Sequence, residues 1–323
     1  MELARPAPPP LVPPTLPRLL TARSIPDAER IADLEDELVR VRPGLFTTTD
    51  PASPVAIAQR DVLLARIAAA RAHLDSEYWF SLDSAAALHG LWTYRLSRRV
   101  HLTQLYPPQV RREDDSWDHR FHLTRHWTAL PLRDRTLVNG VPVTTIERTA
   151  ADCARLLSLP AALVVMDCAL HHRADRELIA RIIDESRGKR GVVQARRVLS
   201  LADAGSESPG ESLTRLAVTD CGLPRPSTQI PVETTLGTKW IDLGWEEPKV
   251  GIEFDGEVKY TDLADGDPDA VRRRERERHE AIEAEGWNLV RNAWPDIDAP
   301  HGFDVRVRRA LAGRWRLLPD RDD

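Results

Sequence analysis

Apolar and polar positions in the last third of the chain alternate in short runs, a pattern typical of strands that are buried on one side. Apolar positions at helical spacing precede and follow these runs. The predicted elements are, in order, a helix at 208–221, strands at 228–235, 239–245 and 249–256, a helix at 268–285, a strand at 287–292 and a helix at 303–314. This order predicts a compact domain in which a mixed sheet is flanked by helices.

The first helix of this domain has a clear start signal. Ser208 suits the N-cap position, Pro209 the first helical position and Glu211 the third. Because Ser and Glu at this spacing form a capping box, Glu211 has a structural role open to it as well as a chemical one.

The beginning of the chain predicts a different and smaller module. A helix is expected at 16–22, a turn at 24–26, a second helix at 27–39 and a hairpin at 40–46. This order is that of a winged helix-turn-helix. Prolines dominate the residues before it, so we expect 1–17 to form a flexible tail.

The long middle block predicts an α-rich region with a small sheet. Helices are expected at 55–74, 84–89, 146–157, 161–171, 176–186 and 192–204, and strands at 99–105, 119–124 and 141–145. The fold class is therefore α/β (α+β). The expected division is a tail at 1–17, the winged-helix-like module at 18–50, the middle domain at 51–204, the C-terminal α/β domain at 205–315 and a second tail at 316–323.

Three acidic residues on neighbouring predicted strands form the main candidate site. Glu253 and Asp255 are two positions apart and therefore share one face of their strand. Antiparallel pairing with the preceding strand would bring Asp242 beside them. Converging carboxylates suit Mg²⁺ or Mn²⁺, and such an ion can activate water for phosphodiester hydrolysis. The same acids would also be compatible with solvated strand ends.

Several short motifs in this domain resemble the very-short-patch-repair-endonuclease-like domain of the PD-(D/E)XK nuclease superfamily. They are Glu211-Ser212-Leu213, Gly222-Leu223-Pro224, Ile241-Asp242-Leu243, Glu253-Phe254-Asp255-Gly256, Gly286-Trp287 and Val290-Arg291. The resemblance implies that Asp242, Glu253 and Asp255 are metal ligands and that Glu211 is an additional catalytic acid on the first helix. The family usually has Lys where this chain has Asp255, so we expect Lys259 to supply the cation that orients the attacking water.

The first half of the chain resembles AbiEi-type antitoxins and transcriptional regulators, in which a winged helix precedes a larger domain. The segments that carry the resemblance are the opening module, Ser84–Leu91 and Val143–Thr149. The helix at 27–39 is strongly acidic and would repel a phosphate backbone. Arg40 and Arg42 on the wing are the candidate phosphate contacts of this module, although lone surface arginines are also compatible with a structural role.

Two other groups of basic residues are candidate nucleic-acid contacts. Arg272, Arg274 and Arg278 begin the helix after the carboxylates and could reach phosphates, although interleaved glutamates allow ion pairs along a solvated helix face instead. Arginines and tryptophans of the middle block, including Arg125 and Trp127, suggest a nucleic-acid face or a core with a basic rim.

Composition limits the alternatives further. The net charge of −5 means that any nucleic-acid contact must come from a local patch. No apolar run is long enough for a membrane span, no secretory signal is visible, and the three cysteines lack CxxC spacing, so we expect a cytoplasmic protein with reduced thiols. Neither GxGxxG nor a Walker A motif occurs, and no nucleotide cofactor is expected.

The sequence favours a Mg²⁺- or Mn²⁺-dependent DNA endonuclease or nickase. The alternative is a non-catalytic DNA-binding regulator or antitoxin whose C-terminal nuclease fold has lost its chemistry. DNA is the expected partner in both cases, and a homodimer is left open.

Overall fold

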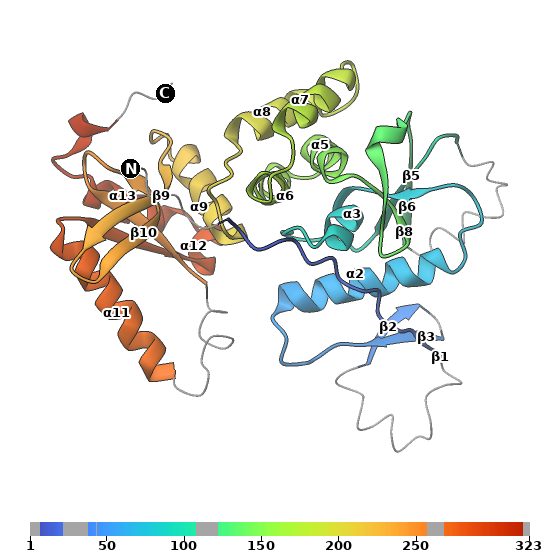
Figure 1. The fold of residues 1–323 in the computed structure, drawn as a ribbon, viewed down its shortest axis with the longest axis horizontal. Coiled ribbons are helices and arrows are strands. Elements are labelled where there is room, and N and C mark those ends of the chain that lie inside the picture. Colours follow the sequence, from blue (N-terminus) through green and yellow to red (C-terminus); the bar gives the residue numbers. More distant parts are fainter. Residues whose placement is uncertain (1–6, 22–37, 43, 108–121, 257–267, 319–323) are drawn as a thin grey trace. The chain divides into compact units, whose positions relative to one another are not determined.

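The chain forms two compact units, one comprising Pro9–Ala202 and the other Asp203–Asp323 with Met1–Pro8. The structure is a computed structural model, and it describes residues 7–21, 38–42, 44–107, 122–256 and 268–318, without the side chains of Arg42 and of residues 268–272. Each unit has its own buried apolar core, so each is described separately (Figure 1).

A small antiparallel sheet and a long helix open the N-terminal unit. The sheet has the order β1-β3-β2, and its strands are β1 (Leu20–Thr21), β2 (Leu38–Arg42) and β3 (Leu45–Thr48). Helix α2 (Val55–Arg71) follows and buries Leu63, Leu64 and Ile67. These side chains join a core that also contains Val41 and Leu45, which fixes the hairpin on the helix.

A five-stranded mixed sheet with the order β6-β5-β4-β8-β7 is the centre of this unit. Its strands are β4 (Trp79–Phe80), β5 (Val100–Gln104), β6 (Leu123–Trp127), β7 (Arg135–Val138) and β8 (Val141–Thr144). Helix α3 (Leu82–His89) lies between β4 and β5 in the chain, and a 3-10 turn, η1 (Leu132–Asp134), precedes β7. Asn139 and Gly140, which link β7 and β8, both have positive φ, as a two-residue hairpin turn requires.

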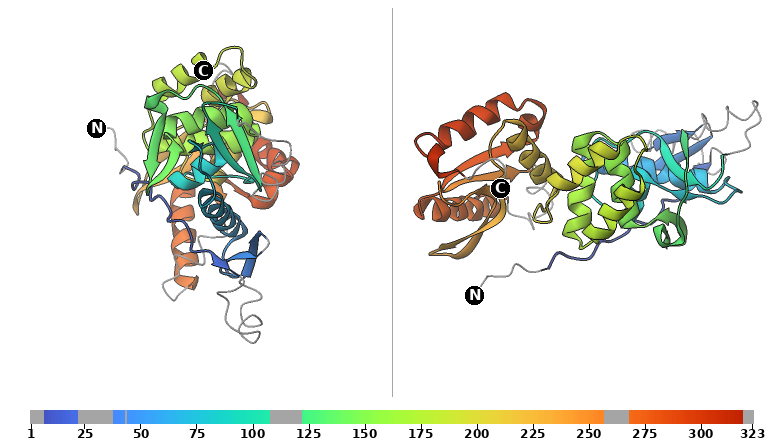
Figure 2. Two further views of the ribbon diagram at one scale, coloured as in Figure 1. Left: turned by 90° about the vertical axis from the view of Figure 1, so that its right-hand side faces the viewer. Right: turned by 90° about the horizontal axis from the view of Figure 1, so that it is seen from above.

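Four helices follow the sheet and pack together beside it (Figure 2). They are α5 (Ile146–Leu156), α6 (Leu159–His171), α7 (Arg176–Glu185) and α8 (Val192–Leu201). Every residue of α6 from Ala161 to Leu170 is buried, which explains the apolar pattern of this segment, which Asp167 interrupts. Gly191 has positive φ and a Cβ there would overlap the Arg155 carbonyl, so α8 can begin close to α5 only with glycine at this position.

The C-terminal unit contains a four-stranded sheet with the order β12-β11-β10-β9. Strands β9 (Ser227–Thr234), β10 (Gly237–Trp245) and β11 (Val250–Asp255) form an antiparallel meander, and β12 (Asn288–Ala293) pairs with β11 in parallel. The helices are α9 (Pro209–Asp220), α11 (Pro268–Ala284), α12 (Trp294–Asp298) and α13 (His301–Ala310), followed by the 3-10 turn η2 (Trp315–Leu317).

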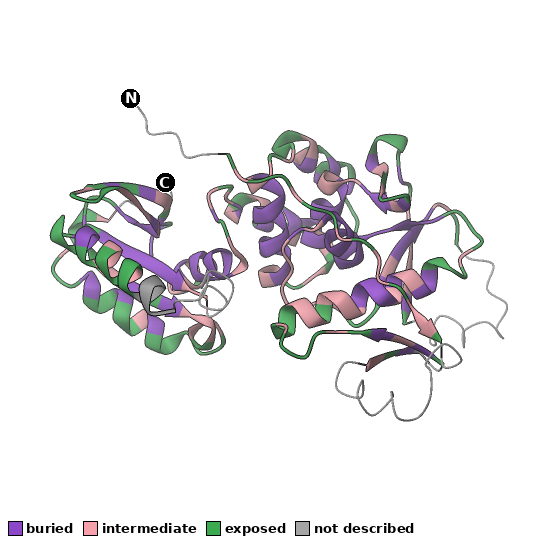
Figure 3. Ribbon diagram, turned by 60° about the horizontal axis from the view of Figure 1, so that its bottom comes forward, coloured by how far each residue is buried: buried purple, intermediate pink, exposed green. Residues whose placement is uncertain are grey.

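Helices cover both faces of this sheet. Val218 of α9 and Phe303 of α13 share one apolar cluster with Leu243 and Ile252. Ile282 of α11 belongs to a second cluster, which also contains Ile230 and Ile241. The exposed positions of α11 lie along its outer side, as Figure 3 shows. The chain therefore has the predicted α/β (α+β) class, and the predicted α-β-β-β-α-β-α order of this unit is confirmed, with α12 as an additional short helix.

Other predictions for the first half of the chain need correction. The helix expected at 16–22 is wrong, because Leu16 and Leu19 pack against the core from extended chain and Leu20–Thr21 forms β1. The helix expected at 27–39 lies outside the described residues except for its last two positions, which belong to β2. Strands β4 and β7 were not predicted, because β4 has two residues and β7 is mostly polar or half-buried.

The contact between α9 and β11 provides a test of this packing. A Cβ at Gly210 would overlap the Phe254 ring, which is itself packed edge-on against Trp294. We expect Gly210→Ala to lower the free energy of unfolding of the C-terminal unit by about 1–3 kcal/mol in urea denaturation, because overpacking outweighs the gain in helix propensity.

Gly302→Ala is the matched control, since Gly302 is also the second residue of its helix and a Cβ there would meet only Arg306 at 3.6 Å. We expect it to be neutral or to stabilise the unit by up to about 1 kcal/mol. Equal effects of the two variants would contradict the packing described.

Candidate functional site

Three predicted acids from three elements come together in the C-terminal unit. They are Glu211 on α9, Asp242 on β10 and Glu253 on β11, and we call them the acidic cluster. The backbone N–H of Phe254 donates to Asp242 Oδ2 at 2.9 Å, which holds the Asp242 carboxylate against β11. Asp242 raises the pKa of both other acids through its charge, so the three groups lie close enough to repel one another.

Glu211 is 6% exposed and accepts three hydrogen bonds. The donors are the Glu207 N–H at 2.9 Å, the Ser208 hydroxyl at 2.9 Å and the Gln229 amide at 3.1 Å. Ser208 Oγ in turn accepts from the Glu211 N–H, so Ser208 caps α9 as predicted. Burial, followed by the charge of Asp242, raises the pKa of Glu211 to about 8. Glu211 thus combines a structural role at the helix start with a place in the acidic cluster.

Glu253 is 5% exposed and is held by α11. Arg278 Nη2 donates to Glu253 Oε1 at 2.7 Å, and Nη1 of the same guanidinium donates to the Trp240 carbonyl at 3.0 Å. Burial raises the pKa of Glu253, while Arg278 opposes this shift. Arg278, expected as a DNA contact, therefore points inward and neutralises part of the cluster.

The remaining predicted site residues are placed differently. Asp255 lies at the end of β11 with 35% of its side chain exposed, and its carboxylate is 3.7 Å from Arg291 Nη1. Lys259 lies outside the described residues. Among the residues that the structure describes, no group of three or more His, Cys, Asp or Glu side chains is arranged to hold a metal ion.

The predicted DNA-contacting arginines divide into three cases. Arg40 is exposed on β2 and Arg274 is exposed on α11. Arg42 lies in β2 and Arg272 in α11, but their side chains are outside the described residues. Arg278 is engaged by Glu253 and Glu275.

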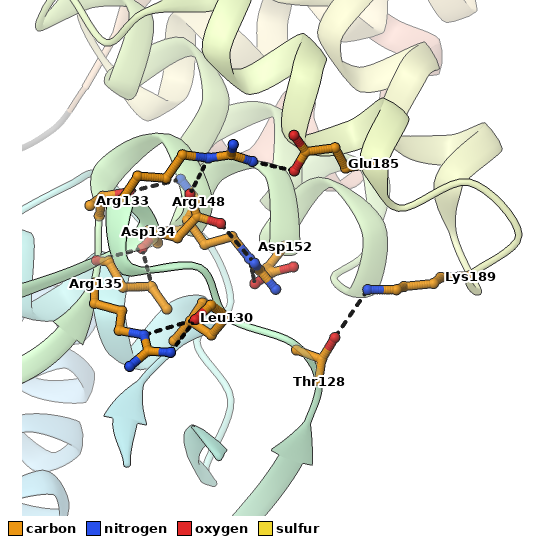
Figure 4. Close-up of polar contacts among 12 residues, drawn as sticks. Thr128, Leu130, Arg133, Asp134, Arg135, Arg148, Asp152, Glu185 and Lys189 are labelled. Carbon is orange, nitrogen blue, oxygen red and sulfur yellow. Dashed lines mark hydrogen bonds and ion pairs between the residues drawn. The ribbon is translucent and has the colours of Figure 1, made fainter. Parts of the chain in front are cut away.

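A network of buried charges that the sequence analysis missed lies in the N-terminal unit (Figure 4). Arg148 is 4% exposed, and it donates from Nε to Asp152 at 2.7 Å and from Nη1 to Asp134 at 3.0 Å. Asp152 also accepts from Arg155 Nη1 at 3.2 Å. The spacing of Arg148, Asp152 and Arg155 on one predicted helix was the available signal, because residues three and four apart face each other.

This network forms part of the wall of a cavity of about 400 Å³. The cavity is lined by Ser81, Leu82, Thr103, Arg125, His126, Trp127, Thr128, Asp152, Arg155, Leu156 and Lys189. Three of these residues are Arg or Lys and one is acidic. Burial, followed by the nearby charges of Arg148 and Arg155, lowers the pKa of Lys189, while Asp152 and Glu185 oppose this shift.

The other chemical features are simple. Cys153 and Cys168 are buried and Cys221 is partly exposed, all as free thiols. Within the described part of the chain, no helix combines the length and apolar character needed to cross a membrane.

The raised pKa of Glu211 predicts a pH dependence of stability. A carboxyl group whose pKa rises from 4.5 to about 8 on folding stabilises the folded state fully below pH 4.5, and this contribution is lost as pH rises through 8. Glu211→Gln mimics the protonated form, so in urea denaturation its stability relative to wild type should increase by roughly 1–3 kcal/mol between pH 6 and pH 9.

The control for this experiment is Glu285→Gln, an exposed position in the same unit. Its pH profile should run parallel to that of wild type. If the stability of Glu211→Gln and that of wild type changed in parallel with pH, the raised pKa assigned to Glu211 would be wrong. EDTA is present throughout, so that no metal ion alters the charge of the cluster.

Part of the N-terminal unit is similar to a known protein family. Residues 80–201, which run from β4 to α8, match the AbiEi antitoxin C-terminal domain. No solved structure matches the chain. Uncharacterized proteins MT2308 and Rv2248 of two Mycobacterium tuberculosis strains are each 30% identical over 282 residues, which span 85% of this chain and 92% of the relative. The chain therefore belongs to the same family as these mycobacterial proteins, and it contains an AbiEi antitoxin C-terminal domain.

Proposed function

We propose that the protein is a DNA-binding regulator of the AbiEi antitoxin type. The match of residues 80–201 to the AbiEi antitoxin C-terminal domain is the observation that carries this proposal. The strands and helices of that segment form one continuous part of the N-terminal unit, so the match covers a folded structure and not a short motif.

The hairpin that precedes this domain supports a contact with DNA. Strands β2 and β3 pair in antiparallel fashion, and Arg40 is exposed on β2. Because the chain carries a net charge of −5, binding must depend on such local basic positions. We assign to Arg40 a phosphate contact, which would position the protein without reading sequence.

A gel-shift titration tests this proposal with the full chain and the DNA upstream of its own gene. Removal of one phosphate contact in Arg40→Ala should weaken binding several-fold and reduce the slope of log affinity against log salt by about one. Arg197→Ala, at an exposed position of α8, should leave both quantities unchanged.

Two results would contradict the regulator proposal. One is the absence of a shift with wild type at low salt. The other is equal binding of upstream and unrelated DNA of the same length. A footprint with two-fold symmetry would indicate that a homodimer binds.

As a second proposal, the C-terminal unit acts as a Mg²⁺- or Mn²⁺-dependent endonuclease of the PD-(D/E)XK type. The repulsion among Glu211, Asp242 and Glu253 favours it, because a divalent cation would relieve that repulsion. The positions of these side chains do not fit a divalent cation, because Arg278 is paired with Glu253 and Asp255 lies beside Arg291. Metal binding therefore requires Arg278 to leave Glu253.

A plasmid-nicking assay with Mn²⁺ separates the two proposals. A nuclease should nick supercoiled plasmid, and Asp242→Asn and Glu253→Gln should each reduce the rate at least about 100-fold. Glu285→Gln is the control and should retain the wild-type rate. Absence of nicking by wild type, or equal nicking by all variants, would exclude the nuclease and leave the regulator proposal intact.

A further inference from the structure

The cavity of the N-terminal unit has the composition of an anion-binding site. Arg125, Arg155 and Lys189 line it together with a single acid, Asp152. That acid is shared between Arg148 and Arg155, at 2.7 and 3.2 Å, so it does not neutralise the whole wall. Arg125 donates to the Gln104 amide oxygen at 3.2 Å and Lys189 to the Thr128 hydroxyl at 3.0 Å.

Two polar atoms in the wall support this interpretation independently of charge. Within the described residues, Ser81 Oγ and Arg155 Nε are buried and have no hydrogen-bond partner. Ser81 is 1% exposed, and 9% of the Arg155 side chain is exposed. Buried polar atoms are almost always paired, because an unpaired one loses its hydrogen bonds to water without replacement. A ligand with several acceptor oxygens would satisfy both atoms.

The wall also provides an apolar surface beside the basic side chains. Trp127, at the end of β6, is 58% exposed, and Leu156 of α5 is 39% exposed. An exposed indole ring stacks well on a nucleobase, because every base offers a π face. The volume of about 400 Å³ lies in the range of small-molecule sites and is too small for a duplex.

We infer that this cavity binds a nucleotide, with the phosphate held by Arg125, Arg155 and Lys189 and the base stacked on Trp127. The shared chemistry is a nucleoside carrying a phosphate, whether free or at the end of a single strand. The chain has no glycine-rich phosphate loop, so the side chains of α5, β6 and the segment before α8 perform that task. This site is separate from the DNA contact assigned to Arg40 and does not depend on it.

Isothermal titration calorimetry with the full chain tests the inference. The probes are the four ribonucleoside monophosphates, inorganic phosphate, adenosine and a 5′-phosphorylated six-nucleotide single strand. We expect at least one nucleotide or the single strand to bind at least 10-fold more tightly than phosphate or adenosine alone. The tighter of the free nucleotide and the single strand identifies the source of the ligand.

Two variants at exposed positions separate the contributions without disturbing the core. Lys189→Met should weaken binding of both nucleotide and phosphate about 10-fold, as expected for loss of a charge-assisted hydrogen bond. Trp127→Ala should weaken binding of the nucleotide about 10-fold but leave phosphate unchanged. Arg133→Met is the control, because Arg133 pairs with Glu185 and does not line the cavity.

The inference is overturned by any of three results. These are the absence of heat with every probe at millimolar concentration, wild-type affinity for the nucleotide in a folded Lys189→Met or Trp127→Ala protein, and equal loss of binding in Arg133→Met. Circular dichroism of each variant accompanies the titration.

Discussion

The buried guanidinium of Arg148 is the interaction on which the N-terminal unit depends. It connects η1, through Asp134, with its own helix α5, through Asp152. A buried charge that loses one partner costs about 3–5 kcal/mol, so the three groups stabilise the fold only as a set. Asp152 then holds Arg155 at the wall of the cavity. The same ion network therefore joins sheet to helix and positions a cation for a ligand.

In the C-terminal unit the corresponding constraint is electrostatic repulsion between carboxylates. Glu211, Asp242 and Glu253 are brought together by elements whose positions are fixed by apolar packing on both faces of the sheet. Arg278 offsets part of this repulsion, and burial together with the charge of Asp242 raises the pKa values of Glu211 and Glu253. Because Arg278 pairs with Glu253, the protein itself balances part of the negative charge of the cluster. This favours the regulator over the nuclease as the function of the chain.

The sequence predicted what periodicity controls and missed what depends on contacts between distant elements. Alternating apolar positions were sufficient for β9–β12, and strand geometry was sufficient to place Asp242 near Glu253. The role of Arg278 could not be predicted, because Glu275 three residues earlier offers an equally good local partner. The cavity could not be predicted from the sequence either, because its wall combines residues from Ser81 to Lys189 that share no sequence motif. Leu20–Thr21 pairs with β3, and Leu16 and Leu19 pack against the core of the N-terminal unit. The sequence of this proline-rich segment does not show that its leucines contact a core.

The two units shift the pKa values of ionisable groups in opposite directions, and this contrast bears on how the protein works. Burial and then the charges of Arg148 and Arg155 lower the pKa of Lys189 beside the cavity, whereas burial and then the charge of Asp242 raise the pKa of Glu211 to about 8. A fold without ligands gains nothing from either shift, because an uncompensated charge is costly to bury. Perturbed pKa values of this kind gather at binding sites. The acidic cluster can neutralise itself by taking up a proton near neutral pH, but an arginine beside the cavity keeps its charge under all physiological conditions. An anionic ligand would add acceptor oxygens for the basic side chains of the cavity wall, and for this reason the N-terminal unit is the stronger candidate for ligand binding.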